Sequence, residues 1–155
     1  MLPTAKRDEQ YMREALKEAQ RASETGEKAV GAVVVHRAQV IARAHHQTKT
    51  LRDPTAHAAV IAITQAANAL HSDRLEGAVL YVTQEPCAMC AGAVLLSGVA
   101  RLAFGAEDVK QGCCGSVANL PAYEQLNRKL SVTKGILSSE CSAILRKSTV
   151  KARSI

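Results

Sequence analysis

The segment EPCAMC at residues 85–90 constrains the fold of this chain most strongly. The apolar run at 78–83 precedes it and predicts a buried strand, and the small-residue run at 91–96 follows it and predicts a helix. Pro86 suits a first helical turn, where its missing N–H costs nothing. Cys87 and Cys90 are therefore expected one turn apart at a helix N-terminus, where unpaired N–H groups and the helix dipole favour thiolates.

A third metal ligand is available in the segment TAHAA at residues 55–59, which is another predicted helix start. His57, Cys87 and Cys90 would together form a three-ligand zinc site with water in the fourth position. Because zinc lowers the pKa of bound water, such an open site is typical of a hydrolytic enzyme.

Simpler interpretations of the same residues remain open at this stage. A lone Cys-x-x-Cys also fits a redox pair or half of a closed structural zinc site, and a histidine such as His57 is often only a hydrogen-bonded polar residue. Cys113, Cys114 and Cys141 form no second Cys-x-x-Cys, which weakens the structural-zinc interpretation. Adjacent Cys113 and Cys114 are expected to be packed side chains rather than extra ligands.

The combination of His57 with Pro-Cys-x-x-Cys matches the signature of zinc deaminases. From about residue 7 to 145 the chain resembles the bacterial tRNA-specific adenosine deaminases. The segments that carry the resemblance are DPTAHA at 53–58, LYVT at 80–83, EPCAMCAG at 85–92, FGAED at 104–108 and GCCGS at 112–116. The resemblance implies a three-layer α/β cytidine-deaminase-like fold, with a five-stranded mixed sheet flanked by helices.

One position departs from that pattern, because Ala59 stands where the family has its proton-transferring glutamate. The site is therefore expected to bind substrate and to turn it over poorly. Backbone N–H groups of Ala58 and Cys87, both near helix starts, are predicted to orient the developing oxygen. Either Ala59 is an engineered substitution that keeps substrate intact, or the chain is a natural non-catalytic relative that partners an active subunit.

Substrate contacts are predicted at Val30, His46 and Pro86. His46 stands where matching deaminases usually have an asparagine that contacts sugar and base, so it either replaces that hydrogen bond or is a solvated loop residue. The implied reaction is zinc-dependent conversion of the wobble adenosine of tRNA to inosine, on the anticodon arm. The alternatives are deamination of a free base or nucleoside such as guanine or cytosine, or a non-catalytic RNA-binding partner subunit. The family also implies a homodimer.

Length, charge and composition limit the possible domain organisation, partners and location of the chain. A chain of 155 residues fits a single deaminase domain over residues 1–155, with a basic tail from about 146 to 155. The formal charge of +6 is compatible with nucleic acid, although the 3% aromatic content argues against extensive base stacking. No apolar run approaches the ~20 residues of a membrane span. Five cysteines without a disulfide-like pattern and a charged N-terminus favour the cytoplasm.

Hydrophobic periodicity and turn residues predict alternating helices and strands, which is typical of an α/β domain. The predicted helices are 5–25, 55–70, 86–97, a short one at 121–126 and one from 138 onward; the predicted strands are 30–36, 39–45, 78–83, 100–104 and 131–137; loops are predicted at 46–52 and 105–119.

Overall fold

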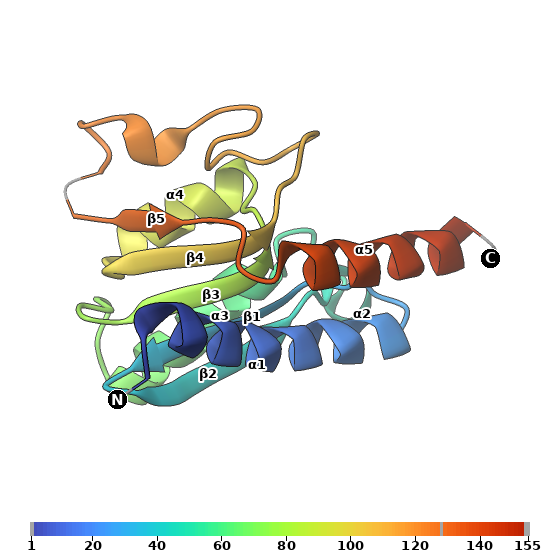
Figure 1. Cartoon of the computed structure of the whole chain (residues 1–155), viewed down its shortest axis with the longest axis horizontal. Coiled ribbons are helices and arrows are strands. Elements are labelled where there is room, and N and C mark those ends of the chain that lie inside the picture. Colours follow the sequence, from blue (N-terminus) through green and yellow to red (C-terminus); the bar gives the residue numbers. More distant parts are fainter. Residues whose placement is uncertain (1, 128, 154–155) are drawn as a thin grey trace.

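The computed structural model describes residues 2–127 and 129–153, with side chains as far as Ser148. Within this part of the chain, five strands form one mixed sheet in the order β2-β1-β3-β4-β5 (Figure 1). β1 pairs antiparallel with both β2 and β3, whereas β3, β4 and β5 run parallel. The predicted fold class is confirmed. The strands are β1 (Gly31–His36), β2 (Gln39–His45), β3 (Val79–Gln84), β4 (Arg101–Ala106) and β5 (Ser131–Thr133).

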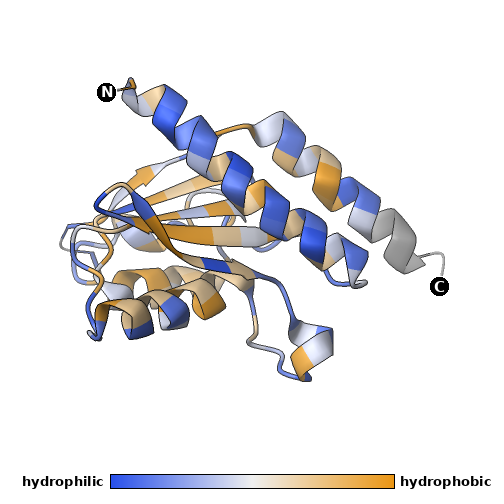
Figure 2. Cartoon of the chain, turned by 90° about the horizontal axis from the view of Figure 1, so that it is seen from below, coloured by the Kyte–Doolittle hydropathy of each residue, from blue (hydrophilic) through white to orange (hydrophobic). Residues whose placement is uncertain are grey.

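Helices cover both faces of the sheet, which explains why β1 is buried along almost its whole length. α1 (Thr4–Glu24) and α5 (Ser138–Arg153) lie side by side on one face, and α3 (Ala58–Leu70) and α4 (Ala88–Ser97) lie on the other (Figures 1 and 2). Each face has its own apolar core, one around Met12, Tyr81 and Cys141 and the larger one around Leu80, Phe104 and Val94. None of the helices in the described residues is long and apolar enough to cross a membrane.

Gly31 sets the distance between α1 and the sheet. A Cβ at this position would lie 2.0 Å from the carbonyl oxygen of Ala15 and 2.5 Å from the amide nitrogen of Ala19. Any side chain at the start of β1 would therefore push α1 away, so the close packing on this face requires glycine.

Several predicted boundaries differ from the structure for identifiable reasons. α3 begins at Ala58 rather than at residue 55, because the Asp53 carboxylate accepts hydrogen bonds from the amide and hydroxyl of Thr55 and holds this segment in a turn. The segment predicted as a loop contains the short helix α2 (Thr48–Leu51). β5 ends at Thr133, ahead of Gly135 and Leu137, which have positive φ angles. A 3-10 turn, η1 (Leu120–Ala122), occupies part of the predicted helix at 121–126.

The basic segment predicted as a tail continues α5, whose backbone is helical to Arg153. Ser148 is buried, and its hydroxyl oxygen accepts a hydrogen bond from the amide of Ala29 at 3.3 Å. The basic side chains at 151 and 153 lie outside the described residues.

Candidate metal centre and active-site cavity

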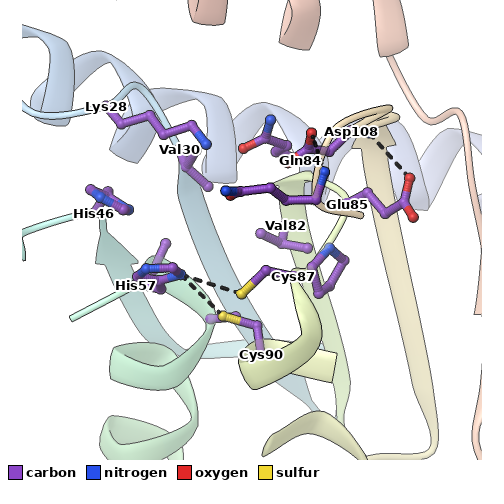
Figure 3. Close-up of a pocket in the computed structure, with 14 residues that line it drawn as sticks. Lys28, Val30, His46, His57, Val82, Gln84, Glu85, Cys87, Cys90 and Asp108 are labelled. Atoms are coloured by element: carbon purple, nitrogen blue, oxygen red, sulfur yellow. Dashed lines mark hydrogen bonds between the residues drawn. The ribbon is translucent and has the colours of Figure 1, made fainter. Parts of the chain in front are cut away.

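Three potential metal ligands meet where α3 and α4 begin (Figure 3). His57 is the N-cap residue of α3 and Cys87 the N-cap residue of α4, both with extended backbone angles, and Cys90 lies in the first turn of α4. His57 and Pro86 were expected inside first helical turns, but both lie just outside the helices. Nδ1 of His57 lies 3.6 Å from Sγ of Cys87 and 3.5 Å from Sγ of Cys90.

The spacing and chemistry of these donors fit zinc. Bonds of about 2.3 Å to sulfur and about 2.0–2.1 Å to nitrogen, at tetrahedral angles, place the nitrogen and sulfur atoms about 3.5 Å apart. Burial lowers the pKa of His57, so its imidazole is neutral and able to donate a lone pair. Burial, with the neighbouring Cys87, raises the pKa of the Cys90 thiol, so a thiolate there needs a cation beside it. The three side chains form the one such group found in the described residues.

All eight residues predicted for the site line a single small cavity of about 40 Å³. They are Val30, His46, His57, Ala58, Ala59, Pro86, Cys87 and Cys90. The remaining lining residues, which received no role from the sequence, are Lys28, Val82, Gln84, Glu85, Asp108 and Gln111. Val82, Glu85 and Asp108 belong to the deaminase-like segments, so these motifs could have indicated them. No sequence pattern indicated Lys28.

The cavity wall at position 59 is a methyl group. Ala59 is almost completely buried, in the first turn of α3 and two residues after His57. Two carboxylates line the cavity, and both are already hydrogen-bonded to the chain. Glu85 accepts bonds from the loop after β4, and Oδ1 of Asp108 accepts the amides of Lys110 and Gln111.

His46 packs on the opposite side of His57 from the cysteines. The two ring centroids are 4.9 Å apart with the planes inclined at 39°, and Nε2 of His46 lies 3.2 Å from the hydroxyl of Thr48. Burial, together with nearby His57 and Lys28, lowers the pKa of His46 to about 4. His46 is thus a half-buried, neutral wall of the cavity at neutral pH.

Cys113 and Cys114 lie outside the metal group. Both are buried within the larger apolar core, and Sγ of Cys113 contacts the carbonyl oxygen of Gln111. The prediction that they pack rather than add ligands agrees with these positions.

A mixed sheet that brings a histidine and a Cys-x-x-Cys together at two helix starts defines the class of zinc-type nucleobase deaminases. The sequence model of the MafB19-like deaminase family matches residues 6–147. The tRNA-specific adenosine deaminase of Bacillus subtilis (strain 168) is 50% identical over 138 residues, which cover 89% of this chain and 86% of that protein. The chain therefore belongs to the MafB19-like deaminases and, among them, to the family of tRNA-specific adenosine deaminases.

Solved structures similar to this chain are also deaminases. One from a study of A-to-I editing by tRNA:A34 deaminases at the wobble position has a TM-score of 0.84 and 41% identity, and the match covers 87% of this chain and 98% of that chain. A guanine deaminase from Nitrosomonas europaea is more distant, with a TM-score of 0.77 and 26% identity over 92% of this chain and 84% of that chain.

Proposed function

We propose that the cavity binds the wobble adenosine of a tRNA anticodon arm for zinc-dependent hydrolytic deamination to inosine. His57, Cys87 and Cys90 would hold the zinc ion. The observation that carries the proposal is the convergence of these three donors at the starts of α3 and α4, beside the cavity. Adenosine in tRNA is favoured over a free base because the tRNA-specific relatives are more similar to this chain than the guanine deaminase is.

The backbone around the cavity offers donors for a substrate. The N–H groups of Ala58 and Cys87 lie at the beginnings of α3 and α4, and neither has a hydrogen-bond partner among the described residues. Both residues line the cavity, so their N–H groups can stabilise negative charge that develops on an oxygen atom there. When bound, zinc would supply a water molecule of lowered pKa for attack on the amino-bearing ring carbon.

Proton transfer is the step that this chain lacks. Deamination requires protons to reach a ring nitrogen and the departing amine, and the methyl group of Ala59 carries none. Glu85 and Asp108 are hydrogen-bonded to backbone N–H groups, which ties both carboxylates to the loop, and the bonds to Glu85 lower its pKa. We infer that the chain holds its substrate and converts it slowly, either as an engineered variant or as the non-catalytic partner of an active subunit.

Replacing Ala59 with glutamate tests the proposed function directly. General acid–base groups contribute about 10²–10⁴ in rate, so Ala59→Glu should raise inosine formation in an anticodon stem-loop by at least that range. Binding should change far less, because the carboxylate acts mainly on the transition state. Inosine and ammonia would be measured with zinc content followed in parallel, and Ala59→Gln provides the neutral control of the same shape.

The same assay separates the alternatives. Activity of Ala59→Glu on guanine or cytosine but not on the stem-loop would replace the tRNA proposal with a free-base deaminase. A fully zinc-loaded Ala59→Glu protein that is inactive on all of these substrates would favour the partner-subunit interpretation. The homodimer and the cytoplasmic location remain predictions.

A further inference from the structure

Among the residues that the structure describes, Lys28 is the one lysine or arginine that lines the cavity, and the deamination chemistry leaves it unused. Its side chain is exposed, and its ammonium group forms no hydrogen bond or ion pair with the side chains described, which are those of residues 2–127 and 129–148. Lys17 and Lys49, by contrast, are partnered: Lys17 binds the Glu14 carboxylate at 2.7 Å, and Lys49 donates to the carbonyl of Gly26 at 3.2 Å. Lys28 is therefore a free cation at the cavity.

The backbone on both sides of Lys28 is held firmly. Glu27 is buried, and its carboxylate accepts the amides of Lys49 and Thr50 at 3.1 and 2.7 Å. Ala29 is also buried, and its amide donates to the hydroxyl of Ser148. An exposed side chain between two anchored neighbours starts from a fixed point, which reduces the entropy lost when it binds a ligand.

The charge of Lys28 acts inside the cavity. Figure 3 shows its amine end directed toward the group of side chains that line the cavity, on the side of Val30. Its charge contributes to the lowered pKa values of His46 and His57, after burial, which places it within electrostatic reach of both rings. Among the described residues, neither of the two acidic residues of the wall, Glu85 and Asp108, forms an ion pair with Lys28.

We propose that Lys28 binds a phosphate group of the substrate and makes the cavity select a phosphate-bearing nucleotide over a free base or nucleoside. The inference rests on the proposed function in that the adenine ring occupies the cavity. Lys28 is the exposed cation of the cavity lining, so a phosphate joined through ribose to a base held in the cavity can approach its ammonium. A lysine ammonium is a point charge suited to phosphate, and a free base offers it no anion.

Equilibrium binding measures this role, since a slowly converting chain leaves the ligand intact. The zinc-loaded full chain would be titrated with three ligands: an anticodon stem-loop with adenosine at the wobble position, adenosine 5′-monophosphate, and adenosine. Lys28→Met removes the charge and Lys28→Arg retains it. Lys17→Met is the matched control. It changes the net charge by the same amount, but Lys17 lies on α1 and does not line the cavity.

Lys28→Met should weaken stem-loop binding about fivefold and reduce the salt dependence of log Kd by about 0.7, the value for one phosphate contact on a single strand. Adenosine binding should not change, and Lys28→Arg should restore the stem-loop affinity. A loss for the monophosphate as well assigns the contact to the phosphate of the target nucleotide; a loss for the stem-loop alone assigns it to a phosphate elsewhere on the strand.

Equal behaviour of Lys28→Met and Lys17→Met with the stem-loop and the monophosphate would overturn the inference and make Lys28 an ordinary solvated lysine. Failure of the proposed function gives a different result, in which the unmodified chain binds the stem-loop no better than adenosine. In that case the comparison of the monophosphate with adenosine still decides whether Lys28 binds phosphate.

Discussion

Glu85 is a buried acid whose carboxylate organises the loop after β4. Its oxygens accept the amides of Asp108 at 3.1 Å, Cys114 at 3.0 Å and Ser116 at 3.1 Å, and also the hydroxyl of Ser116. Burial alone would raise the pKa of Glu85, but these hydrogen bonds outweigh it and lower the pKa. This arrangement requires glycine at position 112, because a Cβ there would lie 2.3 Å from the carboxyl carbon of Glu85.

Glu85→Gln should destabilise the protein and loosen this loop. A glutamine has one acceptor oxygen and an NH₂ group that would face N–H donors, so bonds to a charged acceptor worth about 1.5–3 kcal/mol are lost. The free energy of unfolding from urea titration should fall by that order, and hydrogen exchange at the amides of Cys114 and Ser116 should become faster. Glu107→Gln, at an exposed acid, is the control; identical effects of the two substitutions would contradict the assigned role.

Some residues of the site could be predicted from the sequence and others could not. His57, Cys87 and Cys90 were predictable because metal ligation demands particular residue types at short spacings beside helix starts. The partners of Glu85 were not, since they lie 23 to 31 positions along the chain and are brought back by the loop after β4. Lys28 carries no motif, and only the position of its anchored neighbours places it at the cavity.

At the scale of elements, α1 is fixed to the sheet by a buried ionic cluster at the end opposite the cavity. The Asp8 carboxylate accepts hydrogen bonds from the Tyr81 hydroxyl on β3 at 2.7 Å and from both terminal nitrogens of Arg101 on β4, at 2.7 and 3.0 Å. Burial opposes ionisation of Asp8, but the bonds from Arg101 and Tyr81 prevail and lower its pKa. The bidentate geometry fixes both the position and the orientation of α1.

Asp8→Asn should therefore cost stability in a pH-dependent way. Arg101 is partly exposed and keeps its hydrogen bonds to Thr133 and Tyr81, so losing its charged acceptor should cost about 1.5–3 kcal/mol near pH 7. Because the folded-state pKa of Asp8 lies below its ordinary value of 3.8, its contribution is complete above that value and is lost as the pH falls through the lower, folded-state pKa. Urea titrations over a range of pH should show the gap between the two proteins closing only in acid. Asp73→Asn, at an exposed acid, should show no such gap at any pH; a gap for Asp8→Asn that persists unchanged into acid would contradict this account.

Elements whose stability is local were predictable, and those held by distant contacts were not. The β3-α4-β4 unit follows from apolar runs that end at turn residues such as Gly98, whereas the hairpin of β1 and β2 follows from its strand pattern, since Arg37 and Ala38 are not typical turn residues. α2 is only four residues long and depends on the Glu27 carboxylate, which accepts the amides of Lys49 and Thr50. Glu27 lies more than 20 residues away in the sequence, and no local pattern at 48–51 indicates its contact, so the segment was predicted as a loop.

At the scale of the whole molecule, the metal centre would join parts of the chain that the sheet alone connects indirectly. His57 follows the antiparallel hairpin, whereas Cys87 and Cys90 follow β3 on the parallel side. A zinc ion bound by all three would cross-link the starts of α3 and α4, which pack against each other over the larger core. Metal binding is therefore expected to stabilise the entire fold rather than the cavity alone.

Zinc removal should lower the melting temperature, and the effect should depend on Cys90. A ligand that binds only the folded state at 100 times its Kd adds about 2.7 kcal/mol, which for a chain of this size corresponds to a shift of roughly 5–10 °C. Scanning calorimetry of the zinc-loaded and chelator-treated protein would measure the shift, with zinc determined per chain. Cys90→Ser should abolish both the bound zinc and the shift. Cys141→Ser, at a buried cysteine in the other core, should melt at a lower temperature but keep the full response to zinc. If Cys90→Ser kept the shift, or if a reductant rather than zinc produced it, Cys87 and Cys90 would be a redox pair and the hydrolytic function would have to be abandoned.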